Sequence, residues 1–207
     1  MPTVSSILAR ILEKPGAAGE KVLDSALSAF LDFGIKRTSM GEIARRAGIS
    51  PATLYRRFES KNDLVEAVSV REAQRYVADI DERVRAVTEP DDQLVEIFVA
   101  FVTTIASNEL LRRLLGTEPE MILPRLTTDG GPILAVGRAY LAEKLRELQA
   151  DIPDLDFDPA LVAEVLARLA QSLALTPDGL IPLDDPVASR EFARSILLPM
   201  VSIRPAH

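Results

Sequence analysis

The sequence contains no cysteine, and its one histidine, His207, is the last residue. Without cysteine, a chain has no disulfide framework, no zinc-finger or iron–sulfur ligand set and no thiol nucleophile. A lone histidine at a chain end, where order is usually lost, does not support histidine acid–base chemistry or a histidine metal site. We therefore expect no catalytic residue, no metal and no cofactor.

Long hydrophobic runs are absent as well. The longest later apolar stretch, Ile97 to Ala106, is far too short to span a bilayer, and the apolar patch near the N-terminus is flanked by charged residues. With 47% hydrophobic residues, the 207-residue chain still has ample material for a buried core. We expect a globular, cytoplasmic protein with one compact domain or two small ones.

Net positive charge is also missing, since the formal net charge is −7. Phosphate binding is driven by Lys and Arg, so this value alone argues against a nucleic-acid partner. The distribution reverses that judgement: from Lys36 to Lys61, seven basic residues against two acidic ones give +5, which leaves −12 for the rest of the chain. This basic block is either the footprint of a nucleic-acid site or a solvated charged face.

Helical spacing of apolar residues is present along most of the chain, and no strand pattern occurs. Glycine stop signals and Ser-Pro or Asp-Pro start signals bound the segments. The expected helices are Glu20 to Phe33, Ser39 to Gly48, Pro51 to Phe58, Ser60 to Val87, Asp91 to Ser107, Glu109 to Gly116, Pro119 to Leu126, Pro132 to Ala150, Pro159 to Leu175 and Pro186 to Ser202. The predicted fold class is all-α.

The segment from Thr38 to Phe58 has the pattern of a helix-turn-helix. Ser39 and Glu42 fit a capping box at the start of the first short helix. Ala44 is small enough for close contact between two helices, and Gly48 suits the tight turn between them. The start of the second short helix would then enter the major groove of DNA.

The residues of this segment resemble the TetR family signature: Thr-Ser, Ile-Ala-Arg-Arg-Ala-Gly-Ile-Ser, Thr-Leu-Tyr, Phe and Ser-Lys-Asn-Asp-Leu. The motif covers roughly Lys21 to Val68, and the rest of the chain is similar to the family in length and helical content. The resemblance implies an N-terminal arm (1–17), a helix-turn-helix DNA-binding domain (18–64) and a C-terminal effector-binding and dimerisation domain (65–207). It further implies a homodimeric repressor that a small apolar or amphipathic effector releases from operator DNA.

The resemblance also implies roles for residues of the motif. Pro51, Ala52 and Thr53 would face base edges, and Tyr55 and Lys61 would contact phosphates. Thr38 and Ser39 would cap the helix against the backbone, and the remaining predicted DNA-binding residues are Arg45, Arg46, Arg56 and Arg57. The structural alternatives are capping by Thr53, wedge filling by Tyr55 and a surface charge at Arg45. Gly41 departs from the family, which often has a longer polar side chain there.

Apolar stripes and nearby polar residues in the C-terminal half suggest an effector cavity, although such stripes also form ordinary core. The predicted effector residues are Phe98, Phe101, Val102, Thr104, Ile105, Asn108, Met121, Ile122, Leu126, Ile133, Val136, Arg138, Tyr140 and Gln171. The predicted dimer residues are Ala163, Ala167, Ala170, Ala174, Phe192, Ile196 and Met200, for which packing within one chain is the alternative.

Two other kinds of function remain open from the residues. An architectural or constitutive DNA-binding protein would have the same helix-turn-helix without an effector. A small enzyme would use carboxylates such as Glu118 and Glu120, but the sequence shows no convergent catalytic constellation around them. The acidic residues from Asp151 to Asp158 lack the glycine and terminal glutamate of an EF-hand loop, so a solvated loop is expected there.

Overall fold

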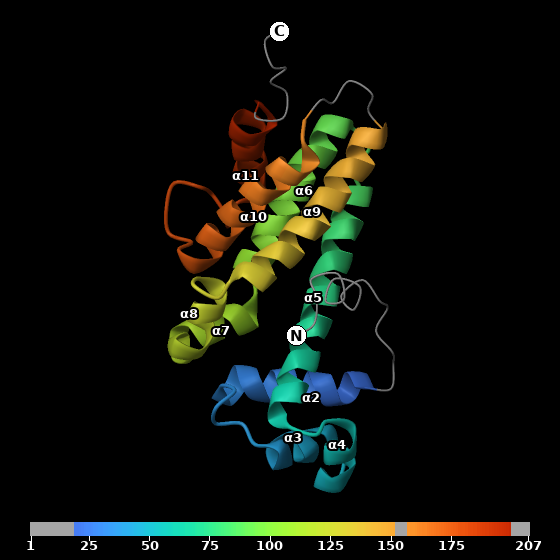
Figure 1. Ribbon diagram of the computed structural model, residues 1–207, viewed down its shortest axis with the longest axis vertical. Coiled ribbons are helices and arrows are strands. Elements are labelled where there is room, and N and C mark those ends of the chain that lie inside the picture. The colour runs from blue at the N-terminus through green and yellow to red at the C-terminus, as the bar shows by residue number, and fades with distance from the viewer. Residues whose placement is uncertain (1–18, 152–156, 200–207) are drawn as a thin grey trace. The chain divides into compact units, whose positions relative to one another are not determined.

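The computed structural model describes residues 19–151 and 157–199, which form helices joined by short connections (Figure 1). The helices are α2 (Glu20–Phe33), α3 (Met40–Ala47), α4 (Pro51–Arg57), α5 (Lys61–Arg85), α6 (Pro90–Ala106), α7 (Glu109–Thr117), α8 (Pro119–Leu126), α9 (Gly131–Asp151), α10 (Pro159–Leu175) and α11 (Pro186–Phe192). The described residues contain no strand. The all-α prediction is confirmed, and the predicted arm (1–17) and Met200 lie outside the described residues.

Most helix starts coincide with the predicted cap residues. The Ser50 hydroxyl accepts a hydrogen bond from the N–H of Thr53 at 3.1 Å, at the start of α4. Ser60 and Asp63 form a complete capping box before α5, with 2.9 and 3.2 Å between each backbone nitrogen and the other side chain. The Asp158 carboxylate caps α10 by accepting from the N–H groups of Ala160 and Leu161. Each cap satisfies amide groups that the first helical turn leaves without a partner.

The last predicted helix differs from the structure. Within Pro186 to Ser202, α11 ends at Phe192, a π-helical turn follows over Ala193–Leu197, and residues 198 and 199 are again α-helical; residues 200–202 lie outside the described residues. The Ser195 hydroxyl donates to the carbonyl of Phe192 at 3.1 Å. A side-chain bond of this kind competes with the regular backbone ladder, which gives a local reason for the wider turn.

The described residues form two compact units. The first, called here the helix-turn-helix unit, contains 19–75 and 108–124; the second, called the C-terminal unit, contains 76–107, 125–151 and 157–199. The division predicted from the sequence was an arm (1–17), a helix-turn-helix domain (18–64) and a C-terminal domain (65–207). The structure divides the chain differently because Leu114 of α7 is buried in the core that α2 and α3 build.

The core of the helix-turn-helix unit lies between α2, α3, α4 and the first half of α5. Its fully buried large side chains include Phe30, Ile43, Leu54, Leu64 and Val68. Leu54 comes from the exposed helix α4, so its burial fixes which face of α4 points away from the core. In Figure 1, α2 (blue) runs across the beginning of α5.

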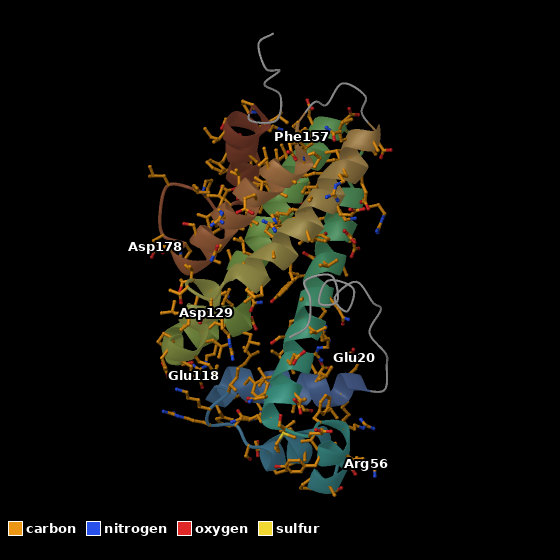
Figure 2. All side chains as sticks on the ribbon, viewed as in Figure 1. Glu20, Arg56, Glu118, Asp129, Phe157 and Asp178 are labelled. Carbon is orange, nitrogen blue, oxygen red and sulfur yellow. The ribbon has the colours of Figure 1, made fainter. Side chains whose placement is uncertain are left out.

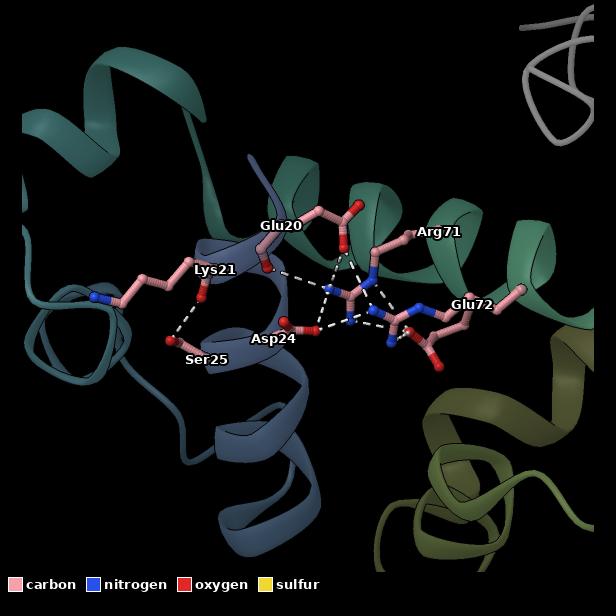
Figure 3. A network of polar contacts seen from close by, with 7 residues as sticks. Glu20, Lys21, Asp24, Ser25, Arg71 and Glu72 are labelled. Atoms are coloured by element: carbon pink, nitrogen blue, oxygen red, sulfur yellow. Dashed lines mark hydrogen bonds and ion pairs between the residues drawn. The ribbon is translucent and has the colours of Figure 1, made fainter. Parts of the chain in front are cut away.

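A buried arginine links α2 to α5 (Figure 3). The Arg71 side chain is only 2% exposed, and its guanidinium donates to Asp24 at 2.7 Å and to Glu72 at 2.9 Å. Glu20 lies 3.6 Å away from the same group. Arg75, which is half exposed, contacts the same three carboxylates from outside. The network fixes the N-terminal half of α2 against α5, because a buried charge is stable only when it is paired.

The C-terminal unit is built around α6, α9 and α10, which share one apolar core with the end of α5. Ala163 and Ala170 of α10 are almost fully buried, and their small side chains allow close approach to the neighbouring helices. Among residues 19–151 and 157–199, no single helix is long and apolar enough to cross a membrane; only α6 and α7, taken together as a bent pair, reach that length and composition.

Candidate DNA-binding site

The turn between α3 and α4 is shaped by two small residues. Gly48 adopts a left-handed conformation with φ of 70°, which glycine accepts at little cost. Ala44 is fully buried, and its carbonyl accepts a hydrogen bond from the N–H of Ile49 at 3.0 Å. The two helices can therefore meet closely, as the sequence pattern predicted.

The outer face of α4 is exposed to solvent. Pro51, Ala52, Tyr55, Arg56 and Arg57 are all exposed, and Figure 2 shows Arg56 at the surface of this helix. Tyr55 is 52% exposed, so it does not fill the wedge between the helices. The face that contains these residues combines small side chains near the helix start with cations near its end. Such a surface can approach a groove and its phosphates.

Thr53 is half buried and belongs to the cap of α4. Its hydroxyl lies 2.9 Å from the hydroxyl of Ser50, and its N–H donates to the same oxygen. Capping, the structural alternative for Thr53, is therefore observed. Base contact by Thr53 remains a prediction. It would require the Thr53 hydroxyl to leave the Ser50 hydroxyl or to bind the base and Ser50 together.

Glu42 holds both arginines of α3. Arg45 donates to its carboxylate at 2.8 and 2.9 Å, and Arg46 donates to it at 2.8 Å. These hydrogen bonds, first from Arg45 and then from Arg46, lower the pKa of Glu42 to about 2. The carboxylate therefore stays ionised in neutral and mildly acidic solution. In the predicted capping box the Glu42 carboxylate would accept from the N–H of Ser39; in the structure it accepts from the two arginines instead. The Ser39 hydroxyl still accepts from the N–H of Glu42 at 3.1 Å.

Arg46 makes further contacts within the unit. Its guanidinium donates to Asp32 at 2.6 Å and to the hydroxyl of Ser28 at 3.0 Å. It also lies 5.0 Å from the centre of the Phe33 ring, within the range of a cation–π contact. These contacts tie α3 to α2. Arg45 has a 73% exposed side chain and is the more accessible of the two predicted DNA contacts.

Lys61 binds the backbone of its own chain, and phosphate contact by Lys61 stays a prediction. Its ammonium donates to three backbone carbonyls, those of Ile35 at 2.9 Å, Lys36 at 3.2 Å and Thr38 at 3.2 Å. An ammonium has three donors, and all three are used here. The structure thus gives Lys61 the task of holding the connection between α2 and α3.

Thr38 is buried, and its hydroxyl lies 2.7 Å from the carbonyl oxygen of Gly34 and 3.1 Å from that of Ala29. It therefore caps the end of α2. Ser39, by contrast, is exposed at the start of α3.

Sequence reasoning missed two carboxylates that contact the α2–α3 connection. They belong to Glu118 and Glu120, which lie 82 and 84 positions after Lys36. Glu118 is 5% exposed and accepts a hydrogen bond from the N–H of Lys36 at 3.0 Å. Glu120 pairs with the ammonium of Lys36. The sequence offered Glu118 and Glu120 only as candidate enzymatic carboxylates, and no local spacing links them to Lys36.

The predicted effector residues are divided between the two units. Asn108, Met121 and Ile122 belong to the helix-turn-helix unit, where Asn108 caps α7 and accepts from the N–H of Leu111 at 2.6 Å. The members that belong to the C-terminal unit are Phe98, Phe101, Val102, Thr104, Ile105, Leu126, Ile133, Val136, Arg138, Tyr140 and Gln171. Phe98 and Val102 are core residues, whereas Ile133 is 52% exposed.

Several of these C-terminal residues contact one another or close neighbours. The rings of Phe101 and Tyr140 stack with their centres 6.5 Å apart. The Tyr140 hydroxyl donates to Asp81 at 2.9 Å. Burial, together with this carboxylate, raises the pKa of Tyr140 well above its usual range. Gln171 donates to the carbonyl of Leu126, and Arg138 pairs with Glu164 on the surface.

Among the described residues of the C-terminal unit, a polar cavity and an apolar cavity differ in size and character. The polar one, of about 190 Å³, lies among α5, α6 and α9, and charged residues such as Asp81, Lys144 and Glu147 line it. The apolar one, of about 10 Å³, lies beside Phe98 and Phe192. The second is barely large enough for one water molecule, so a larger ligand would have to displace side chains there.

The predicted dimer residues fall into two groups. Ala163, Ala167 and Ala170 are buried within the chain's own core, as the alternative of intrachain packing describes, and Ala174 is partly buried. Ile196 is 53% exposed, and Phe192 packs against Phe98 with ring centres 6.4 Å apart. The exposed apolar side chains of α10 and α11 are Leu161, Val165 and Val187.

Two family models match the chain. The model described as bacterial regulatory proteins of the tetR family matches residues 22–68, which include α3 and α4. The model described as the C-terminal domain of bacterial tetracyclin repressor matches residues 90–190. Together the two models cover more than half of the chain.

Known relatives agree with these matches. The HTH-type transcriptional regulator AlkX of Mycobacterium tuberculosis is 29% identical over 204 residues, which are 95% of this chain and 94% of the relative. The crystal structure of the TetR family repressor AlkX from Dietzia, implicated in biodegradation of n-alkanes, is 22% identical with a TM-score of 0.60, covering 87% of this chain and 97% of that one. The fatty acid degradation regulator FadR from Bacillus halodurans is 17% identical with a TM-score of 0.57, covering 93% and 100%. The chain therefore belongs to the TetR family of bacterial regulatory proteins and is a DNA-binding transcriptional regulator.

Proposed function

We propose that the protein is a homodimeric repressor that binds a pseudo-palindromic operator through α4 and leaves it when an aliphatic molecule binds the C-terminal unit. The observation that carries the DNA part of the proposal is the exposed face of α4. Small residues at the start of that helix admit close approach to base edges, and Arg56 near its end supplies a cation for a phosphate or a guanine. Binding to the chromosome is consistent with the predicted cytoplasmic location.

Selection from a random duplex library tests this function. The full-length protein should enrich one sequence with two-fold symmetry, because a single helix-turn-helix is too small to specify a site alone. The half-sites should be about 34–36 Å apart, one turn of DNA. Equal binding to all duplexes would instead favour the architectural alternative, and no binding to any duplex would contradict the proposal.

Salt dependence separates Lys61 from the exposed arginine of α4. We expect Lys61→Met to leave the slope of log affinity against log salt unchanged, because its ammonium binds backbone carbonyls rather than phosphate. The same change should lower the free energy of unfolding by about 1–3 kcal/mol. Arg56→Ala should instead reduce that slope by about one if Arg56 contacts phosphate. Fluorescence anisotropy on the selected duplex at several salt concentrations measures both; a reduced slope for Lys61→Met would restore the phosphate role.

The dimer contacts are assigned to the exposed apolar residues of α10 and α11. Leu161 and Val187 are each 66% exposed and Val165 is 45% exposed, so their burial against a partner would favour association. A second copy of the chain is the proposed partner, since the family typically forms homodimers.

We expect Val165→Glu to convert the dimer into a monomer, because a buried carboxylate without a partner opposes association. The matched control is Ile133→Glu on α9, at a side chain that is 52% exposed in the same unit. Sedimentation velocity over a range of concentrations measures both variants. A dimer of unchanged strength in Val165→Glu would place the interface elsewhere.

An aliphatic effector is supported by two facts. The predicted effector residues Phe98, Phe101 and Val102 belong to an apolar core, and two structural relatives are a repressor implicated in biodegradation of n-alkanes and a regulator of fatty acid degradation. A screen of n-alkanes and of fatty acids of increasing length should find compounds that release the selected duplex. By linkage, such a compound must bind the free dimer more tightly than the DNA complex. Equal affinity for both forms, or release by no member of either series, would contradict this part of the proposal.

A further inference from the structure

The connection between α2 and α3, residues 34–38, is held mostly by side chains. The N–H of Gly34 closes α2 by donating to the carbonyl of Phe30 at 2.9 Å. The Thr38 hydroxyl reaches back to the carbonyl of Gly34. Lys61 occupies the carbonyls of Ile35, Lys36 and Thr38 from the start of α5. The connection is therefore a fixed part of the helix-turn-helix unit.

One peptide group in this connection lies between two opposite charges. The carbonyl oxygen of Ile35 is 2.9 Å from the Lys61 ammonium, and the N–H of the same peptide, on Lys36, donates to the Glu118 carboxylate at 3.0 Å. A positive charge at the oxygen end and a negative charge at the hydrogen end both favour the same polarisation of the peptide. Each hydrogen bond thus strengthens the other.

Glu118 is itself held in place by the junction of α7 and α8. Its N–H donates to the carbonyl of Leu114 at 2.8 Å, and its carbonyl accepts from the N–H of Met121 at 3.0 Å. Leu114 and Met121 pack on the core of the helix-turn-helix unit. The carboxylate therefore reaches the α2–α3 connection from a backbone that is anchored on both sides.

The position of the Glu118 carboxylate also depends on Gly34. A Cβ atom added to Gly34 would overlap the Glu118 Oε1 atom, so any other residue at this position would require the carboxylate to shift. The Glu118 side chain is almost fully buried, and Figure 2 labels it at the α7–α8 junction. Gly34 and Glu118 thus form a matched pair although they are far apart in sequence.

We propose that Glu118 is a positioning residue for DNA binding. By holding the Ile35–Lys36 peptide, it fixes the point at which α3 begins at its cap residue Ser39, and through α3 it fixes the direction of the exposed face of α4. The hydrogen bonds of the Glu118 carboxylate described above are to the α2–α3 connection, and Glu118 acts on α4 through that connection. This inference rests on the proposed operator binding.

The test uses the full-length protein and the duplex selected by the unsubstituted protein. Glu118→Ala removes the acceptor, Glu118→Gln keeps an oxygen acceptor of nearly the same length, and Glu120→Gln is the matched control. The Glu120 carboxylate also contacts Lys36, through the ammonium group, but the Glu120 side chain is 62% exposed. Fluorescence anisotropy gives the affinity, and amide hydrogen exchange followed by NMR reports on the N–H of Lys36.

We expect Glu118→Ala to lose about tenfold or more in affinity and to lose a similar factor in protection of the Lys36 N–H, as removal of a hydrogen bond to a charged group implies. Glu118→Gln should stay within about threefold of the unsubstituted protein in both measurements, since it rescues the acceptor. Glu120→Gln should stay within about twofold, as exposed ion pairs contribute little. Circular dichroism at the assay temperature establishes that each variant is folded.

Three results would overturn the inference. The first is unchanged affinity in Glu118→Ala despite lost protection of Lys36, and the second is a loss in Glu118→Gln equal to that in Glu118→Ala. If Glu118→Ala does not fold, Glu118→Asp takes its place, because its carboxylate is one methylene too short to reach Lys36. The third overturning result is tighter binding of the duplex by Glu118→Asp than by Glu118→Gln. Failure of the unsubstituted protein to bind any duplex would contradict the proposed function, which this series distinguishes from failure of Glu118 alone.

Discussion

Replacement of Gly34 by alanine is expected to lower the free energy of unfolding by about 2–4 kcal/mol. Gly34 has φ of 80° and ψ of 163°, a backbone conformation that residues with a Cβ atom rarely adopt. The added methyl group would also overlap the carboxylate of Glu118. Both costs arise in the folded state, so they add to destabilise it. Urea unfolding followed by circular dichroism measures the loss.

A glycine in an ordinary helical position provides the control for this change. Gly116 lies in α7, and a Cβ atom there would meet no atom within 4 Å. Gly116→Ala should therefore stabilise the protein by about 0.5–1 kcal/mol. The double variant Gly34→Ala/Glu118→Ala should regain part of the loss, because it removes the overlap but keeps the unfavourable φ. A loss below 1 kcal/mol in Gly34→Ala alone would mean that the connection adjusts without strain.

Replacement of Arg71 by alanine is expected to cost about 3–5 kcal/mol of stability, as breaking a buried ion pair usually does. The guanidinium is 2% exposed and is the shared partner of Asp24, Glu72 and Glu20. Without it, three carboxylates would lie close together, with only the outer Arg75 to offset their repulsion. The change should therefore loosen α2 from α5 and lower the affinity for the selected duplex as well.

Arg75→Ala is the matched control, because Arg75 contacts the same carboxylates from a side chain that is 48% exposed. Its loss should cost about 0–1 kcal/mol, the usual range for surface ion pairs. The two variants are compared by urea unfolding under the same conditions. Equal losses in both would indicate that burial of Arg71 adds nothing to the strength of the network.

Local signals in the sequence were sufficient to predict most of the fold. Ser60 and Asp63 stand three residues apart, and the cap that they form depends only on that spacing. The helix-turn-helix followed in the same way from Ala44 and Gly48, since both act on residues next to them. The pairing of Glu42 with Arg45 and Arg46 lies within one helical turn and was in principle visible from spacing as well.

Contacts between distant residues could not be predicted in this way. Lys61 meets carbonyls 23 to 26 positions earlier, and Glu118 meets Lys36 across 82 positions. Nothing in the residues around Lys61 distinguishes a carbonyl partner from a phosphate partner, because an ammonium binds both. The alanines of α10 present the same difficulty: small residues at helical spacing permit close approach to a helix of the same chain or of another. The effector and dimer residues stay predictions.

Because residues 108–124 belong to the helix-turn-helix unit, the construction of hybrid regulators is constrained. A fusion that takes only the first 75 residues and joins them to a foreign sensor would leave out 108–124. Leu114 would be missing from the core around Phe30, and the Lys36 N–H would lose its hydrogen bond to the Glu118 carboxylate. A functional hybrid must therefore include residues 108–124 as well as the first 75 residues. Otherwise its sensor domain must supply a glutamate at the position equivalent to Glu118. A joint at the end of the motif is the natural choice from sequence, yet it would divide the helix-turn-helix unit.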